Sequence, residues 1–170
     1  MDLRNKIRSV QNFPKEGIDF KDITTLLKDK EAFKECIKQM ANKFKNEKID
    51  IIVGAEARGF IIGAPLAYEL NAGFVPVRKL GKLPSDTIKY EYELEYGTDT
   101  LEMHKDAISK GNRVLIVDDL LATGGTSYSV AKMVETLGGE VVGFDFLIEL
   151  EFLNGREVLK GYKVESIIKY

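Results

Sequence analysis

The chain has 170 residues, of which 44% are hydrophobic and 31% are charged, and its formal net charge is −2. This length fits one domain of about 100–200 residues, and the composition excludes a disordered or fibrous chain. With one cysteine, Cys36, and one histidine, His104, the chain cannot build an internal disulfide, a multi-ligand Cys/His zinc site or an iron–sulfur cluster. We therefore expect a single domain, residues 1–170, that works with carboxylates, Arg and Lys, hydroxyls, backbone dipoles or a borrowed metal.

The charge pattern argues against nucleic acid and membranes as partners. Lysines between residues 34 and 48 have roughly helical spacing, which is typical of the solvated face of an amphipathic helix. No run approaches the ~18 apolar residues of a membrane span, and no apolar stretch follows the N-terminal charges. The sequence therefore predicts a cytoplasmic protein that binds neither nucleic acid nor membranes.

The sequence predicts that the first 48 residues form a segment added to the core and that the remaining residues form an α/β fold. The addition comprises a short helix, a loop at residues 13–17, and a helix from about Lys30 to Lys45 on which Cys36 is a packing residue. Beyond it, buried strands and helices alternate, which implies right-handed crossovers and a parallel sheet between helical layers. Ligands of such sheets bind at the carboxyl ends of the strands. The predicted strands are residues 50–54, 74–77, 113–117 and 141–148, and the predicted helices are residues 59–71 and 126–137.

Residues 79–99 interrupt this alternation. Within them, residues 89–96 alternate in polarity with a period of two, and Gly81, Pro84 and Gly97 bracket the stretch. One side of this pattern is too polar for the core, so we expect an exposed β-ribbon, or flap, of the kind that often acts as a lid.

The most informative stretch is residues 114–127. A hydrophobic strand ends in Asp118 and Asp119, and a helix then begins at two glycines flanked by threonines. Such glycines let backbone N–H groups converge, and the helix N-terminus and hydroxyls add further donors, so this loop predicts a phosphate cradle. The two acids would repel a phosphate and are expected at sugar hydroxyls nearby. The pattern indicates a ribose 5-phosphate site and matches neither a Walker A loop nor a GxGxxG fingerprint.

This stretch resembles the signature of the type I phosphoribosyltransferases. In that family the acid pair holds the ribose hydroxyls of phosphoribosyl pyrophosphate, and the loop binds its 5-phosphate. Four further segments resemble the adenine-specific members in the same order, so the resemblance covers nearly the whole chain. It implies a parallel-sheet type I phosphoribosyltransferase fold with helices on both faces, a flap at residues 79–99 and a base-binding hood at residues 1–48. The four segments are residues 13–23, 54–60, 77–84 and 94–97, and the loop residues are Ala122, Thr123, Gly124, Gly125 and Thr126.

The resemblance also implies a pyrophosphate end of the site. Residues 55–58 join a strand end to a helix start, where N–H groups gather, and Arg58 adds a forked donor suited to pyrophosphate. The family assigns Arg78 and Lys79 to the same end, whereas Lys82 fits a solvated surface as well as a substrate contact. The residues of this loop are Ala55, Glu56, Ala57 and Arg58.

The loop before residue 21 predicts the base pocket. Phe20 offers a ring face to a purine, and the backbone beside it offers N–H and C=O groups to an amino-pyrimidine edge. By resemblance, the backbone at Asp19 reads N1 and the exocyclic amine, although Glu16 and Asp19 depart from the residues of many relatives. The expected base-binding residues are Ile18, Asp19, Phe20 and Lys21.

The end of the flap supplies a candidate acid or base. The family points to Glu95 for proton transfer with the purine ring and to Tyr96 as a neighbouring substrate contact. A solvated glutamate in a row with Glu91 and Glu93 is the alternative for Glu95. For His104 a structural or surface role is expected, because no carboxylate partner is evident.

The resemblance implies that the chain joins adenine to phosphoribosyl pyrophosphate to give AMP and pyrophosphate. Mg²⁺ would arrive with the substrate, no protein metal site is expected, and the chain would form a homodimer. Three alternatives stay open: a sibling enzyme acting on hypoxanthine, guanine, xanthine or orotate; a non-catalytic sensor of phosphoribosyl pyrophosphate; and a phosphatase-like metal site at the acid pair.

Overall fold

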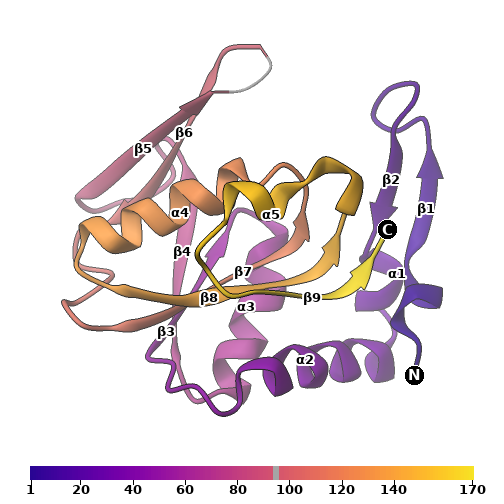
Figure 1. The fold of residues 1–170 in the computed structure, drawn as a ribbon, viewed down its shortest axis with the longest axis horizontal. Coiled ribbons are helices and arrows are strands. Elements are labelled where there is room, and N and C mark those ends of the chain that lie inside the picture. Colours follow the sequence, from indigo (N-terminus) through magenta and orange to yellow (C-terminus); the bar gives the residue numbers. More distant parts are fainter. Residues whose placement is uncertain (94–95) are drawn as a thin grey trace.

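A mostly parallel sheet organises the computed structural model, which describes residues 1–93 and 96–170 (Figure 1). Its seven strands lie in the order β5-β6-β4-β3-β7-β8-β9. Five strands run parallel to their neighbours, and β5 and β6 form an antiparallel ribbon at one edge, which confirms the predicted sheet and ribbon. The strands are β3 (Ile51–Ala55), β4 (Gly73–Lys79), β5 (Thr87–Glu93), β6 (Thr98–His104), β7 (Arg113–Leu121), β8 (Glu140–Glu149) and β9 (Val164–Lys169).

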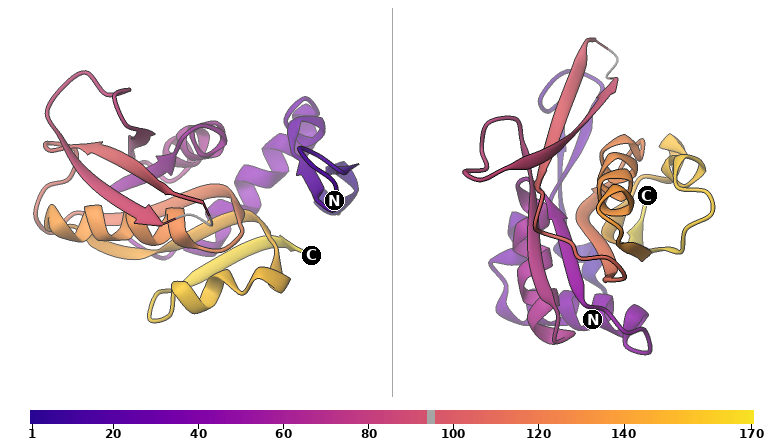
Figure 2. Two further views of the ribbon diagram at one scale, coloured as in Figure 1. Left: turned by 90° about the horizontal axis from the view of Figure 1, so that it is seen from above. Right: turned by 90° about the vertical axis from the view of Figure 1, so that its left-hand side faces the viewer.

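Helices cover both faces of the sheet, as predicted (Figure 2). Along β7, Leu115 and Val117 pack into one core with α2 (Lys30–Phe44) and α3 (Arg58–Glu69). Val114 and Ile116 pack into a second core with α4 (Gly125–Thr136). Side chains of a strand alternate between its two faces, so the aliphatic run of β7 serves both cores. Among the described residues, no helix combines the length and apolar character that crossing a bilayer requires.

Helix α2 confirms the sequence prediction for the second half of the N-terminal segment. Asp29 caps its start, because its Oδ1 accepts the N–H groups of Glu31 and Ala32 at 3.1 Å each. Cys36 is fully buried on its inner face, and burial raises the pKa of this thiol to about 12. The thiol is therefore a packing group.

The first half of that segment holds a hairpin that the sequence did not predict. After η1 (Leu3–Lys6), strands β1 (Arg8–Gln11) and β2 (Asp19–Asp22) pair antiparallel, and α1 (Thr24–Leu27) leads on to α2. Each strand has four residues, and β1 is largely exposed. Because such short strands carry no alternation of apolar and polar residues, the usual pattern for a strand is missing.

The prediction that Asp118 and Asp119 end their strand was wrong. Strand β7 continues to Leu121, because β8 pairs with it as far as Leu121 and Glu149. On the other side, pairing between β3 and β7 stops at Gly54 and Val117. The acid pair therefore lies inside a strand, at the level where the neighbouring strand has ended.

The ribbon and the C-terminus also extend past the predicted elements. Strand β6 continues beyond residue 99 to His104 and joins the main sheet by pairing with β4 at Arg78 and Lys79, while its Leu101 and Met103 are buried. The C-terminal residues, for which we predicted no elements, form η2 (Glu151–Leu153), α5 (Gly155–Val158) and β9. Both additions depend on pairing between segments far apart in the chain.

Asp145 is a buried acid in the middle of β8. Its side chain is fully buried, and neither carboxyl oxygen has a hydrogen-bond partner among the described residues. Burial, reinforced by the nearby Glu165, raises the pKa of Asp145 well above its usual range, although Lys43 and Lys163 oppose the shift. The folded protein therefore favours the neutral acid.

Asp145 should make the stability of the fold depend on pH. In an unfolded chain an aspartate has a pKa of about 3.9. The contribution of Asp145 to the free energy of unfolding is therefore fully present below that pH, and it is lost as the pH rises toward the raised pKa of the folded protein. In Asp145→Asn this titration is absent, so the free energy of unfolding should fall less between about pH 4 and pH 8 than in wild type, by about 1.4 kcal/mol per unit of pKa difference. Urea unfolding measures it, with the exposed Asp106→Asn as control. Equal pH slopes in wild type and Asp145→Asn would contradict the prediction.

Candidate functional site

The site lies where β3 and β7 end their pairing, between the β1–β2 hairpin and the β5–β6 ribbon. In Figure 1 the ribbon rises at the upper left and the hairpin at the upper right, and the carboxyl ends of β7 and β8 lie between them. This is the carboxyl edge at which open parallel sheets bind ligands. The structure brings together there four groups of predicted residues: the cradle, the acid pair, the loop at residues 55–58 and the hairpin.

The phosphate cradle, Ala122–Thr126, joins β7 to α4. It borders a cavity of about 90 Å³ that Asp118 also lines. Gly124 has φ 90°, a left-handed conformation that favours glycine, and no side chain caps the start of α4. The first N–H groups of this 12-residue helix therefore remain available to an anion beside the hydroxyls of Thr123 and Thr126.

Helix α5 supports the cradle from the side. A Cβ atom built on Gly155 would lie 2.5 Å from the Ala122 carbonyl oxygen, so only glycine allows this approach. The next residue, Arg156, anchors the segment because its Nε and Nη2 donate to the two Glu149 carboxylate oxygens at 2.7 and 2.8 Å. Sequence reasoning missed both residues, because their role depends on how the C-terminal segment folds back on β7.

The two side chains of the acid pair, Asp118 and Asp119, lie in different surroundings. Asp119 is 5% exposed, and its Oδ2 accepts from Nε of Arg58 at 2.5 Å. Asp118 lies beside the cradle, and its Oδ1 accepts the N–H of Asp119 at 2.9 Å. Burial and the adjacent charge of Asp119 raise the pKa of Asp118 well above its usual range. The free site therefore carries less negative charge than two ionised acids would give it.

Arg58 connects the acid pair to the hairpin. It is the first residue of α3, and its guanidinium carbon lies 5.7 Å from the centre of the Phe20 ring. Partial burial opposes its charge, but the carboxylate of Asp119 prevails and raises the pKa of Arg58. The guanidinium is thus a permanent cation between an aromatic ring and a carboxylate.

Two basic residues, Arg78 and Lys79, contact the loop Ala55–Arg58, Arg78 through its side chain and Lys79 through its backbone. The Oε2 of Glu56 accepts the N–H of Lys79 at 2.9 Å and lies 3.5 Å from Nε of Arg78. The Lys79 N–H is the largest contribution that lowers the pKa of Glu56, ahead of Arg78. Lys82 is exposed, and its carbonyl lies 3.5 Å from Nη1 of Arg78. Arg78 and Lys79 therefore belong to this loop's surroundings, and Lys82 lies at their border.

The hairpin presents Phe20 and an open strand edge. The rings of Phe13 and Phe20 meet edge to face at 5.2 Å and line a cavity of about 310 Å³ with Val10 and Asp22. Among the described residues strand β2 pairs only with β1, so alternate N–H and C=O groups on its other edge have no strand partner there. Asp22 is held at the foot by the Thr24 N–H and by Arg8, which lower its pKa to about 2.

The other predicted hairpin residues point away from Phe20. Side chains alternate along a strand, and Nζ of Lys21 accordingly lies 2.9 Å from both Ser9 Oγ and Asp19 Oδ2 on the opposite face. Ile18 lies in the turn, where its carbonyl accepts the N–H of Phe13. The side chains of Asp19 and Lys21 therefore lie on the other face, and only the backbone groups of these residues lie at the strand edge beside Phe20.

The ribbon contributes one residue that sequence reasoning missed. The hydroxyl of Tyr92 lies 3.5 Å from Oγ1 of Thr126, at the cradle, and 3.5 Å from Oδ2 of Asp99. Tyr96 is 86% exposed near the ribbon tip, and Glu95 lies outside the described residues. At the base of the ribbon, Nε2 of His104 accepts the N–H of Ser85 at 3.4 Å, which agrees with the structural role expected for it.

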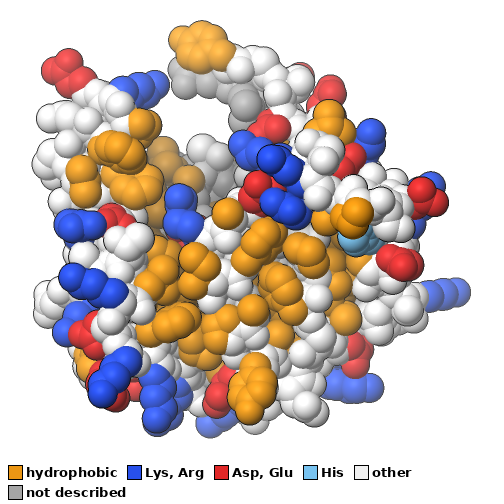
Figure 3. Space-filling model, turned by 180° about the vertical axis from the view of Figure 1, so that it is seen from behind, with side chains coloured by type: hydrophobic (Ala, Val, Ile, Leu, Met, Phe, Trp, Pro, Cys, Tyr) orange, Lys and Arg blue, Asp and Glu red, His pale blue; other side chains and the backbone are white. Residues whose placement is uncertain are grey.

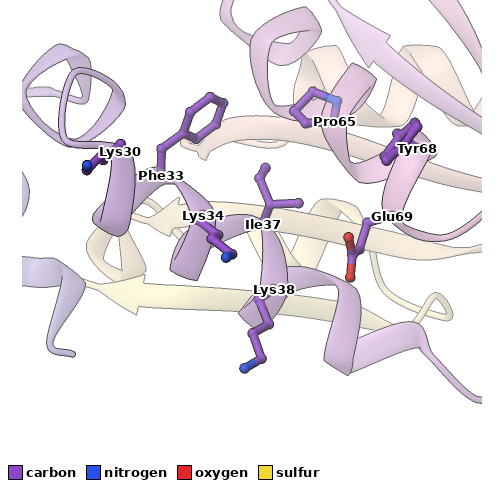
Figure 4. Close-up of a pocket in the computed structure, with 8 residues that line it drawn as sticks. All are labelled: Lys30, Phe33, Lys34, Ile37, Lys38, Pro65, Tyr68 and Glu69. Carbon is purple, nitrogen blue, oxygen red and sulfur yellow. The ribbon is translucent and has the colours of Figure 1, made fainter.

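A separate groove of about 580 Å³ runs between α2 and α3 (Figure 4). Phe33, Ile37 and Pro65 form apolar walls, and lysines lie at its rim. It contains none of the predicted site residues. Among the described residues, no group of three or more His, Cys, Asp or Glu side chains has the arrangement to hold a metal ion.

Comparison with known proteins agrees with this geometry. Residues 22–166 match the family described as phosphoribosyl transferase domain. A relative named adenine phosphoribosyltransferase, from Alkaliphilus metalliredigens, is 65% identical over 170 residues, with both chains fully covered. The crystal structure of adenine phosphoribosyltransferase from Thermoanaerobacter pseudethanolicus is 59% identical, with a TM-score of 0.97 over 99% of this chain and 98% of that one. The Saccharomyces cerevisiae enzyme, crystallised with adenine and an imino-altritol bisphosphate, is 42% identical, with a TM-score of 0.91 over 96% and 95% of the two chains. The chain therefore belongs to the phosphoribosyltransferase family, in which adenine phosphoribosyltransferases match it along its whole length.

Proposed function

We propose that the protein transfers the phosphoribosyl group of phosphoribosyl pyrophosphate to adenine, giving AMP and pyrophosphate. The contact that carries this proposal is Arg58 between Phe20 and Asp119, because it places an aromatic ring, a cation and the acid pair side by side. The full-length relatives named for this activity support the choice of base.

The 5-phosphate occupies the cradle in this proposal. Its oxygens accept from the free N–H groups at the start of α4 and from the hydroxyls of Thr123 and Thr126. Asp118 and Asp119 then face the ribose hydroxyls as acceptors. A raised pKa of Asp118 favours this arrangement, because a neutral acid repels the approaching phosphate less than a carboxylate does.

The departing pyrophosphate lies at the loop Ala55–Arg58. The transition state of glycosyl transfer resembles an oxocarbenium ion, so negative charge grows on the leaving group. Arg58, Arg78 and Lys79 supply fixed positive charge where it develops. In this proposal Mg²⁺ enters with phosphoribosyl pyrophosphate, as part of the substrate.

The adenine ring lies beside Phe20 at the open edge of β2. Backbone N–H and C=O groups at Asp19 and Lys21 pair with N1 and the exocyclic amine, while the Phe20 ring supplies apolar contact. Reading by the backbone does not depend on the side chain at residue 19. This explains how the hairpin accommodates an aspartate whose carboxylate faces the other way, toward Lys21.

The ribbon acts as a lid over the reacting atoms, with Glu95 as the acid or base for the purine ring. The contact of Tyr92 with Thr126 supports closure, because it links the ribbon to the cradle. A closed ribbon excludes water that would otherwise hydrolyse the activated sugar.

The cytoplasmic location expected from the sequence stays a prediction.

The protein works as a homodimer in this proposal, with α3 in the interface. Ile61 and Tyr68 lie two turns apart on α3 and are 44% and 89% exposed. Tyr68 also lines the groove between α2 and α3, and Figure 3 shows hydrophobic side chains gathered on the face seen from behind. Exposed apolar patches of this kind mark interaction surfaces.

The activity is tested with purified protein, Mg²⁺, phosphoribosyl pyrophosphate and equal concentrations of adenine, hypoxanthine, guanine and xanthine. We expect AMP and pyrophosphate in equal amounts, with the other nucleotides formed at roughly one-hundredth of that rate or less, since unpaired polar groups reject wrong bases. Chromatography of the products measures both. Binding of phosphoribosyl pyrophosphate without any product would instead indicate a non-catalytic sensor of phosphoribosyl pyrophosphate.

The same assay tests Glu95. Near-normal turnover by Glu95→Gln would show that Glu95 is not the acid or base.

Gly155→Ala should weaken the binding of phosphoribosyl pyrophosphate. Its Cβ would lie 2.5 Å from the Ala122 carbonyl oxygen and push the cradle out of place. We expect its KM for phosphoribosyl pyrophosphate to rise roughly tenfold or more, because small displacements of positioning groups are costly. The control is Gly73→Ala, whose Cβ would meet mainly a flexible Ile51 methyl group at 3.1 Å at the start of β4. Equal KM values for the two variants would contradict this role of Gly155.

Tyr68→Glu should convert the dimer into monomers, because a carboxylate placed in an apolar interface loses its hydration. Sedimentation equilibrium measures the mass. The control is Phe152→Glu, which replaces an apolar residue that is also largely exposed, at 70%, but lies outside α3. A monomeric wild type, or a dimer that survives Tyr68→Glu, would contradict the proposed interface.

A further inference from the structure

The hairpin needs contacts outside its own strands to hold its position. Strands β1 and β2 form a separate two-stranded sheet, and within residues 1–93 and 96–170 no backbone ladder joins them to the main sheet. At the foot of the hairpin, Nζ of Lys6 lies 2.7 Å from Oδ2 of Asp29, and Thr25 donates to the Lys6 carbonyl at 2.6 Å. These contacts attach the foot, but they leave the tilt of the strands to be set by other residues.

The last residue of the chain lies against the hairpin (Figure 1). Tyr170 follows β9 and is fixed to the sheet edge, because its N–H donates to Glu149 at 2.9 Å and its carbonyl accepts from Glu151 at 2.8 Å. Glu149 at the end of β8 therefore fixes both the backbone of Tyr170 and the side chain of Arg156 beside the cradle.

Two cations from the N-terminal segment meet this ring. Nζ of Lys21, in β2, lies 4.1 Å from the ring centre, and the guanidinium carbon of Arg4, in η1, lies 4.9 Å from it. Arg4 also donates to the Lys169 carbonyl at 2.5 Å. The Lys21 side chain is only 10% exposed, and cation–π contacts strengthen as the cation loses water.

We propose that Tyr170 is a positioning residue for base binding. Through Lys21, which it holds from behind, it sets the distance between the open edge of β2 and the acid pair. Tyr170 thus acts on Lys21, whose backbone lies at that edge, on the strand that also carries Phe20. This inference rests on the proposed function, since it assumes that the base binds at the hairpin.

The test compares Tyr170→Ala with Tyr170→Phe in steady-state kinetics. In Tyr170→Ala we expect the KM for adenine to rise roughly three- to tenfold, the range that loss of a desolvated cation–π contact allows, with the KM for phosphoribosyl pyrophosphate changed by less than about twofold. Tyr170→Phe keeps the ring face and should match wild type. Arg4→Met removes one cation while the tyrosine stays, and should raise the KM for adenine by a smaller factor.

Amide hydrogen exchange of residues 8–22, without ligand, supplies a second readout. Exchange should be faster in Tyr170→Ala than in wild type and restored in Tyr170→Phe. Unchanged exchange, equal rises of both KM values, or failure of Tyr170→Phe to restore the KM for adenine would each overturn the proposal. If Tyr170→Ala does not fold, Arg4→Met decides by the same two readouts. If wild type forms no AMP, the proposed function fails, while hydrogen exchange still decides whether Tyr170 holds the hairpin.

Discussion

The ion pair between Arg58 and Asp119 is the interaction on which the rest of the site depends. Its Nε–Oδ2 distance is 2.5 Å, and Asp119 is almost fully buried. A buried carboxylate without a partner would be costly, so the pair fixes Arg58 at the start of α3 against the middle of β7. Because the same guanidinium lies near the Phe20 ring, one side chain at the end of the loop Ala55–Arg58 reaches both the acid pair and the hairpin.

The structure keeps the charges of the candidate site apart. Free N–H groups at the start of α4 lie at one end, and Arg58, Arg78 and Lys79 lie toward the other. Between these ends, Arg58 pairs with Asp119, and burial raises the pKa of Asp118. This separation lets the proposed function place an anionic sugar phosphate beside two acids without using a histidine or a thiol.

The C-terminal twenty residues link the two binding regions. Gly155 and Arg156 support the cradle, and Tyr170 contacts the back of the hairpin, and both positions are set by pairing to the end of β8. A short segment therefore connects the sheet both to the loop before α4 and to the hairpin. Nothing in its local sequence indicates this, since the partners lie up to 165 residues away.

The sequence by itself determined the layered sheet, and it located the turn between β7 and α4 and the loop at residues 55–58 at the candidate site. Aliphatic runs such as Val114–Val117 mark strands covered on both faces, and glycines next to threonines mark an anion-binding turn, so local chemistry is sufficient there. Only the tertiary structure showed the polar hairpin, the continuation of β7 through Asp118 and Asp119, and the contacts of Tyr92, Gly155 and Tyr170. The hairpin was missed because its four-residue strands carry no alternation of apolar and polar residues. Each of the other features depends on a partner from another segment, and such pairing leaves no periodic pattern in the residues that make it.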